Sequence, residues 1–145
     1  MACAVCLPSL LPAQQTRLTV EPASQVVIKR GASAPVILKI AILPGYHVNS
    51  DKPKDEFLIP FRLTWTPGPV KPGAVNYPAP EQVQVGADKL SVFTGNFDVT
   101  TQFGAPSDAA TGSVVMTGKL HYQACNDRMC FRPITLDVRI PVLVE

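Results

Sequence analysis

The fold is decided by the stretch KLHYQACNDRMCFRPITLDVRIPVLV, residues 119–144. Apolar residues alternate with polar ones along both of its ends, which is the pattern of strands that bury one face. Between these ends, Asn126 and Asp127 favour a turn. The stretch therefore predicts an antiparallel hairpin in which Cys125 and Cys130 face each other across the mouth of the turn.

Short alternating segments, separated by proline and glycine, fill the rest of the chain. The first hairpin strand, 119–124, is the end of a longer inward-facing series from Val114 to Ala124. Besides the hairpin, strands are expected over 35–43, Phe61 to Trp65, and Phe97 to Phe103. About eight strands at this spacing, without helical periodicity, predict an all-β domain built as an antiparallel β-sandwich.

Three local features carry more detailed expectations. The near-continuous apolar run 35–43 is typical of a central buried strand. Gly118 interrupts an inward-facing series and indicates a β-bulge. The proline-rich stretch Pro67 to Pro80 is expected to be a long connection that crosses between sheets.

The composition excludes several classes of function. Of the 145 residues, 46% are hydrophobic and 17% are charged, which is typical of a globular domain. The net charge is +2 and no basic stripe is present, so nucleic acid is not an expected partner. Fifteen prolines argue against long helices, and no apolar stretch of 18 residues is present to span a membrane.

Residues 1–15, MACAVCLPSLLPAQQ, are uncharged and apolar, and we interpret them as a signal-peptide remnant or a disordered lead-in to a domain over 16–145. Cys3 and Cys6 within them form a C-x-x-C pair without the strand-then-helix context of a redox motif. An exported chain would leave Cys125 and Cys130 as the only cysteines of the mature domain, in an oxidising compartment that favours a disulfide.

The chemistry of the cysteine pair allows three interpretations. A disulfide that closes so short a loop adds little stability, and its position at a turn exposes it to an incoming thiolate, which favours redox exchange. Arg128 and Arg132 would lower a cysteine pKa, whereas Asp127 would raise it. A structural staple remains the second interpretation, in a module that binds a partner through a strand edge.

A metal site is the third interpretation. Cys125 and Cys130 with His121, and with His47 or Met129 in addition, form a soft ligand set of the kind that holds Cu(I). The chain has only two histidines, and a lone histidine on a strand is more often a solvated surface residue.

The hairpin segment YQACNDRMCFRP, residues 122–133, resembles the end of the periplasmic N-terminal domain of the DsbD family of thiol:disulfide interchange proteins. The segments GYHVNS, residues 45–50, and DEFLIP, residues 55–60, are similar to that family as well. The resemblance extends over about residues 17–144 and implies an immunoglobulin-like β-sandwich.

The resemblance also implies a function, that of a protein-disulfide reductase-type oxidoreductase in the periplasm. Such a domain takes electrons from a membrane-embedded thiol reductase and passes them to oxidised thioredoxin-like periplasmic proteins. By this resemblance Cys130 is the attacking thiol, Cys125 is the resolving thiol, and no cofactor is needed.

The same resemblance implies which residues surround the pair. They are Tyr46, which matches a family aromatic, together with Tyr122, Asn126, Asp127, Phe131 and Phe93. It further implies a capping loop near residues 86–93, where this chain lacks the family's acidic-aromatic motif, and the loop between the cysteines is one residue shorter than in the family pattern.

Overall fold

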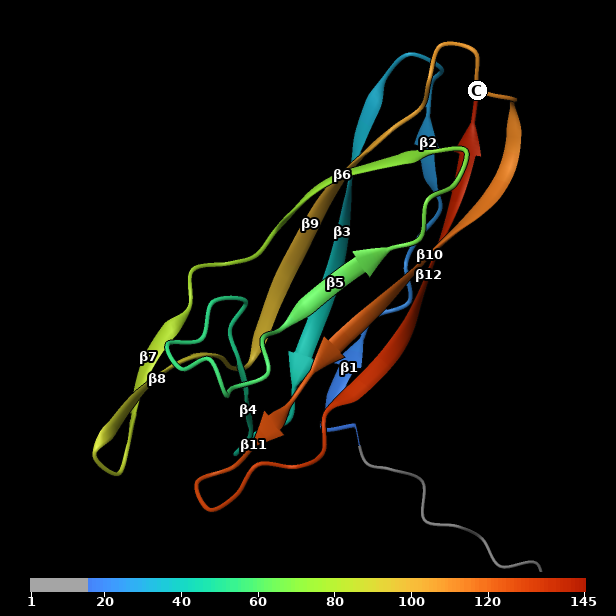
Figure 1. Cartoon of the computed structure of the whole chain (residues 1–145). Coiled ribbons are helices and arrows are strands. Elements are labelled where there is room, and N and C mark those ends of the chain that lie inside the picture. The colour runs from blue at the N-terminus through green and yellow to red at the C-terminus, as the bar shows by residue number, and fades with distance from the viewer. Residues whose placement is uncertain (1–15) are drawn as a thin grey trace, which may run out of the picture.

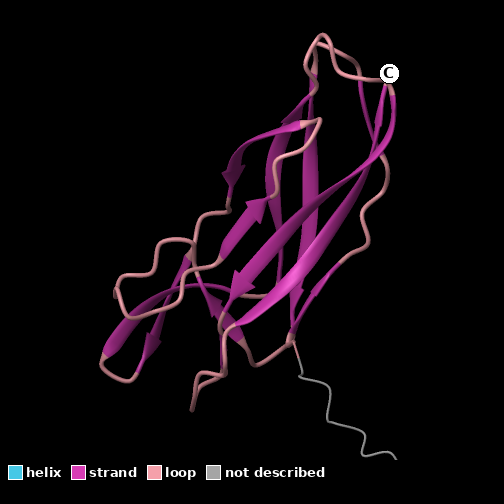
Figure 2. Ribbon diagram, turned by 45° about the vertical axis from the view of Figure 1, so that its right-hand side comes forward, coloured by secondary structure: helices cyan, strands magenta, loops and turns pink. Residues whose placement is uncertain are grey.

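The computed structural model describes residues 16–145 as a β-sandwich with a hairpin projecting from one end (Figure 1). Figure 2 shows only strands and loops in this part of the chain. The strands are β1 (Leu18–Val20), β2 (Val26–Ile28), β3 (Ser33–Ile42), β4 (His47–Asn49), β5 (Arg62–Trp65), β6 (Lys71–Asn76), β7 (Glu81–Val85), β8 (Asp88–Phe93), β9 (Asn96–Gly104), β10 (Gly112–Tyr122), β11 (Ala124–Cys125) and β12 (Ile134–Val144).

Two four-stranded sheets form the sandwich. The first has the order β1-β3-β9-β6 and the second the order β2-β12-β10-β5. Their longest pairing joins β10 to β12 through eleven consecutive residue pairs, from Gly112 opposite Val144 to Tyr122 opposite Ile134. All pairings within the two sheets are antiparallel except the one between β2 and β12, which is parallel. The expected all-β sandwich and its terminal hairpin are confirmed.

A third sheet, which we call the end sheet, has the order β11-β4-β8-β7 and closes one end of the sandwich. It is built from extensions of the other two: β11 follows β10 after a single residue, and β8 leads into β9 through a turn at Gly95. The two cysteines are therefore carried where the main sheets give way to the end sheet (Figure 1).

The core lies between the two main sheets. Trp65 of the second sheet donates its indole N–H to the Thr101 hydroxyl of the first at 3.0 Å, and its ring meets that of Phe103 edge-on at 4.9 Å. Burial of such aromatic and aliphatic side chains provides most of the favourable free energy of folding.

Gly118 accommodates this tryptophan, because a Cβ atom at position 118 would lie 2.8 Å from the Trp65 ring. The β10 ladder is regular at Gly118, so the expected bulge there is wrong. The register shift lies instead in β6, between Pro72 and Val75.

Two further expectations are corrected. The stretch from Pro67 to Pro80 crosses from the second sheet to the first as expected, but it also contains a strand, β6. This strand lies at a sheet edge, where proline is tolerated because one side of the strand needs no partner. The run 35–43 is a central strand as expected, but only its alternate residues, such as Leu38, are buried, and Ile37 is 49% exposed.

Within residues 16–145 there is no helix of the length and hydropathy needed to cross a membrane. The interpretation of residues 1–15, including Cys3 and Cys6, concerns a segment outside the described residues.

Candidate active site

Cys125 and Cys130 form a disulfide at the tip of the β10–β12 hairpin, with their Cα atoms 4.0 Å apart. The two residues also pair as an isolated antiparallel bridge, so they face each other as the sequence predicts. Their environments differ sharply. Cys125 is 2% exposed, whereas Cys130 is exposed. An incoming thiolate therefore reaches the sulfur of Cys130 more readily than that of Cys125.

The loop between the cysteines is ordered by Asn126. Its side-chain oxygen accepts hydrogen bonds from the backbone N–H groups of Arg128 at 2.9 Å and Met129 at 2.8 Å. Its own N–H donates to the Met129 carbonyl oxygen at 2.9 Å. This local bonding is the reason that asparagine favours turns, and it holds the two cysteines together from the loop side.

A second turn brings β4 alongside β11. Pro44 and Gly45 occupy its central positions, and Gly45 has φ of 85°, as the third residue of a type II turn requires. The turn is closed by a hydrogen bond from the Tyr46 N–H to the Leu43 carbonyl oxygen at 3.2 Å. The chain then enters β4, where His47 lies directly opposite Cys125 in the antiparallel register.

Three side chains stack beside the disulfide. The guanidinium carbon of Arg17 lies 3.5 Å from the centroid of the Phe131 ring and 5.5 Å from that of Tyr46. The two rings are 6.0 Å apart. Both cation distances fall within the range of a favourable cation–π contact. Phe131 follows Cys130 directly in the chain, so the stack packs Arg17 and Tyr46 against the residue next to the exposed cysteine.

Backbone contacts fix Arg17 in this place. Its carbonyl oxygen accepts a hydrogen bond from Leu43 at 3.0 Å, and its φ of 57° lies in the left-handed region that residues other than glycine rarely adopt. The preceding residue, Thr16, accepts a hydrogen bond from the hydroxyl of buried Tyr122 at 2.5 Å. Burial raises the pKa of Tyr122 to about 12, although the hydrogen bond to Thr16 opposes this effect, so the phenol remains a donor.

His47 is the titratable side chain closest in register to the pair. Burial lowers the pKa of its imidazole from 6.5. Its Nε2 atom is buried and has no hydrogen-bond partner among residues 16–145.

The structure brings most of the sequence-predicted neighbours to the pair. Asn126 and the exposed Asp127 lie in the loop between the cysteines, Phe131 follows Cys130, and Tyr46 packs against Phe131. Tyr122 lies in the core, where its hydroxyl bonds Thr16. Phe93 lies elsewhere. It is 3% exposed in the core, where its ring contacts Phe61 and Phe97, on β8, two strands away from β11.

Residues 86–93, where a capping loop was expected, form the turn and second strand of the β7–β8 hairpin. Gly86, with φ of 62°, lies in the turn, and Phe93 pairs with Val48 of β4. The hairpin therefore shares the end sheet with Cys125.

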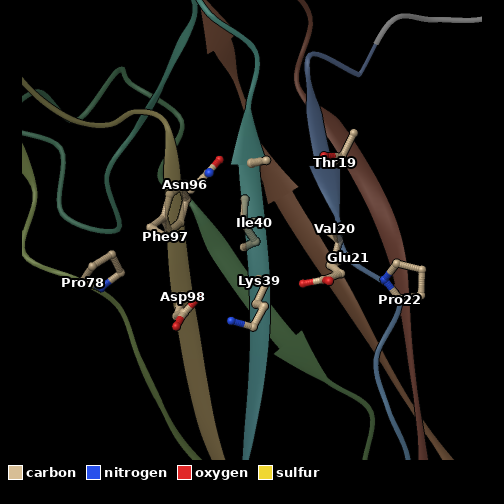
Figure 3. Close-up of a pocket in the computed structure, with 11 residues that line it drawn as sticks. Thr19, Val20, Glu21, Pro22, Lys39, Ile40, Pro78, Asn96, Phe97 and Asp98 are labelled. Atoms are coloured by element: carbon tan, nitrogen blue, oxygen red, sulfur yellow. The ribbon is translucent and has the colours of Figure 1, made fainter.

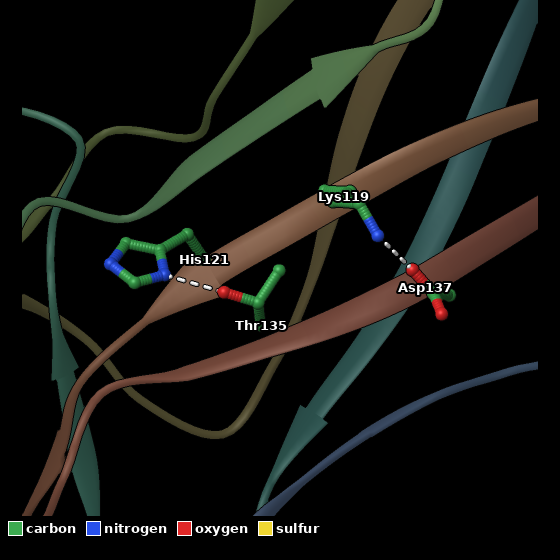
Figure 4. Close-up of polar contacts among 4 residues, drawn as sticks. All are labelled: Lys119, His121, Thr135 and Asp137. Carbon is green, nitrogen blue, oxygen red and sulfur yellow. Dashed lines mark hydrogen bonds and ion pairs between the residues drawn. The ribbon is translucent and has the colours of Figure 1, made fainter.

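His121 does not complete a metal site with the cysteines. Its Nδ1 atom hydrogen-bonds the Thr135 hydroxyl at 2.8 Å on the exposed face of the β10–β12 ladder, beside the Lys119–Asp137 ion pair (Figure 4). In the described part of the chain, no group of three or more His, Cys, Asp or Glu side chains is arranged to hold a metal ion.

A hollow of about 800 Å³ is lined by residues other than the two cysteines. Strands β1, β3 and β9 line it together with Pro78, and Glu21, Lys39 and Asp98 mark its edges (Figure 3). No cysteine lines it, so we assign the thiol chemistry to the disulfide and not to this hollow.

The sequence did not indicate that Arg17 would flank the pair, and it suggested His47 only as a possible metal ligand. Arg17 is the first charged residue of the chain, and His47 stands in the GYHVNS segment, but only the pairing of β4 with β11 and the turn at Gly45 bring them together.

Solved structures similar to this chain support the fold. The N-terminal domain of DsbD from Neisseria meningitidis in its reduced form is 18% identical, with a TM-score of 0.56 over 90% of this chain and 89% of that one. The N-terminal periplasmic domain of ScsB from Proteus mirabilis is 15% identical, with a TM-score of 0.53 over 86% of this chain. The match spans less than half, 43%, of the ScsB chain. A comparison with curated protein sequences gives no match.

These structural likenesses establish an immunoglobulin-like sandwich, as the resemblance implied. The sequence itself matches a family model, described as the N-terminal domain of the thiol:disulfide interchange protein DsbD, over residues 14–141. The reaction type of that family is thiol–disulfide exchange, and the disulfide at the hairpin tip is suited to it. The chain belongs to the family of DsbD N-terminal domains.

Proposed function

We propose that this domain relays electrons in the periplasm, from a membrane-embedded thiol reductase to oxidised thioredoxin-like proteins, through Cys125 and Cys130. Cys130 forms the mixed disulfide with each partner, and Cys125 resolves it. The observation that carries this proposal is the difference in exposure between the two cysteines, since Cys125 is 2% exposed and Cys130 is exposed.

Thiol–disulfide exchange requires three sulfur atoms in line, so the attacked sulfur must be open to a partner. Cys130 meets this requirement. Cys125 lies in the end sheet, with its Cα atom 4.0 Å from that of Cys130, and therefore remains within reach of Cys130 after a partner has bound there.

The surface around Cys130 fits a protein partner. Met129, next to Cys130, is 55% exposed, and Leu43, at the turn before Tyr46, is 47% exposed. The rings of Tyr46 and Phe131 are half-buried. Exposed Arg128 and Arg132 border this apolar patch. Aromatic, methionine and arginine side chains are enriched where proteins bind one another.

The test is a pair of single variants and one equilibrium measurement. In thiol-trapping experiments with an oxidised thioredoxin-like protein, Cys125→Ser should accumulate a covalent complex, whereas Cys130→Ser should form none. The reduction potential of the wild-type pair should lie between about −180 and −270 mV, the range of thiol-exchange proteins.

A potential below about −300 mV, together with no trapped complex, would show that the disulfide is structural. The domain would then be a partner-binding module, whose binding the double serine variant would leave unchanged.

A further inference from the structure

The buried Nε2 atom of His47, beside the disulfide, has no role in the function proposed above. His47 and Cys125 are direct partners in the β4–β11 ladder. Side chains of direct partners project from the same face of a sheet, with Cβ atoms about 4.5–5.5 Å apart. The neighbouring pair, Val48 and Ala124, is buried in the core, so the His47 imidazole and the Cys125 sulfur lie together on the opposite face.

The state of the imidazole suits a proton acceptor. Burial lowers its pKa from 6.5, so the ring is uncharged at neutral pH. A neutral imidazole has one nitrogen with a free lone pair. Nε2 is buried and lacks a hydrogen-bond partner among residues 16–145, and buried polar atoms of this kind are rare in folded proteins.

Cys125 is the thiol that needs such an acceptor. Only the thiolate attacks a disulfide, and a thiolate that is buried loses most of its hydration. Cys130 is exposed and ionises in contact with water, but Cys125 is 2% exposed.

We propose that His47 is a catalytic residue of the relay, taking the proton from the Cys125 thiol when Cys125 resolves the mixed disulfide and returning it in the reverse reaction. The inference deepens the proposed function and rests on it.

The step balances in atoms and electrons. The reduced Cys130 thiolate has already attacked the partner's disulfide, so Cys130 is bonded to one partner sulfur. The Cys125 proton moves to His47, and the Cys125 sulfur attacks the Cys130 sulfur. The Cys125–Cys130 bond forms, the bond from Cys130 to the partner breaks, and the partner sulfur leaves as a thiolate that takes up the proton. Two electrons pass from the domain to the partner's disulfide.

Several neighbouring elements carry other charged residues. On the elements that pack against β4 they are Asp88 and Lys89 of β8, Asp127 and Arg128 in the loop after β11, and Arg17 above the Tyr46 ring. None of these residues pairs directly with Cys125 in the ladder, whereas His47 does.

The test follows both half-steps in one time course. Reduced protein is mixed with dithiobis(nitrobenzoate), and release of the coloured thiolate is recorded by stopped flow at several pH values. The first release reports attack by Cys130, and the second reports displacement by Cys125. In His47→Gln the first release should be unchanged, and the second should slow about a hundredfold at neutral pH.

Two readouts separate proton transfer from a structural effect. The deficit of His47→Gln should disappear at alkaline pH, where Cys125 ionises unaided, and added imidazole should accelerate the second release in His47→Ala. His121→Gln is the matched control and should behave as the wild type, because His121 bonds Thr135 on the exposed ladder face.

An unchanged second release in His47→Gln, or an equal deficit at every pH, would overturn the role of His47 and leave the relay standing. A wild-type protein that shows no second release at all would overturn the relay, and this inference with it.

Discussion

The β10–β12 hairpin has two regions that are held together in different ways. Its body is a ladder of eleven regular residue pairs whose inner face is part of the core. Its tip, residues 123–133, depends on the disulfide, the Asn126 hydrogen bonds and the stack of Arg17, Phe131 and Tyr46. The difference teaches that the ladder and the hairpin tip depend on separate interactions, and we therefore expect the ladder to remain intact when the disulfide opens.

The largest loss of stability is expected from a substitution in the body of the hairpin. Leu120 is fully buried and pairs with both Leu136 and Leu63. Leu120→Ala should lower the free energy of unfolding by about 2–5 kcal/mol, because it leaves a cavity between the sheets. Urea unfolding followed by tryptophan fluorescence measures this loss. A loss under 1 kcal/mol, with Leu120→Met as the volume-conserving control, would show that the ladder is not the stable region.

Reducing the disulfide should lower the free energy of unfolding by less than Leu120→Ala does. The bond joins residues only five positions apart, so it restricts the unfolded chain little, and reduction should cost at most about 2 kcal/mol. Amide hydrogen exchange before and after reduction should show increased exchange in residues 123–133 and unchanged protection in β10 and β12. Loss of protection along the whole ladder would contradict the separation of the two regions.

Removing the hydrogen bonds within the loop between the cysteines tests the tip without changing the ladder. Asn126→Ala deletes the acceptor for the N–H groups of Arg128 and Met129, at a cost of about 1 kcal/mol to the closed loop. Because the ordered loop favours the disulfide, the reduction potential should rise by roughly 20 mV. Asn126→Asp retains the acceptor and should lie near the wild type, and equal potentials in all three proteins would contradict this account of the loop.

The smallest effect concerns the outer face of the ladder. The hydrogen bond from Lys119, followed by its charge, holds the pKa of Asp137 below 3.8. A carboxylate with a lowered folded-state pKa stabilises the protein above its unfolded pKa, and this contribution is lost as the pH falls below 3.8. Both side chains are largely exposed, at 65% and 75%, so the effect is slight.

Urea midpoints of the wild type and Lys119→Ala, compared from pH 7 to pH 2, measure it. A small difference at pH 7 should vanish at pH 2. A difference that grows toward pH 2 would show that Lys119 acts other than through Asp137.

The same two regions differ in how far the sequence predicted them. The alternation in 134–144 arises from burial of one strand face, and that local pattern is sufficient to place β12 and its hairpin partner. The cysteine pair was also predictable, because the turn residues and both cysteines are close in sequence.

What the sequence missed depends on long-range pairing. β6 was not predicted because Pro72 and Gly73 disfavour strands in general, and only its position at a sheet edge makes them acceptable. The contacts of Arg17 and His47 with the tip arise from residues about 80 to 115 positions apart, which no local pattern encodes.

The hydrogen bond between Tyr122 and Thr16 has a practical consequence for any assay that tethers this domain. It fixes the first described residue at the same end of the molecule as the disulfide, whereas Glu145 lies at the far end (Figure 1). A domain attached to a solid support through its C-terminus would present Cys130 to the solution, and one attached near Thr16 would turn Cys130 toward the support. Kinetic measurements on immobilised protein should therefore use the C-terminal linkage.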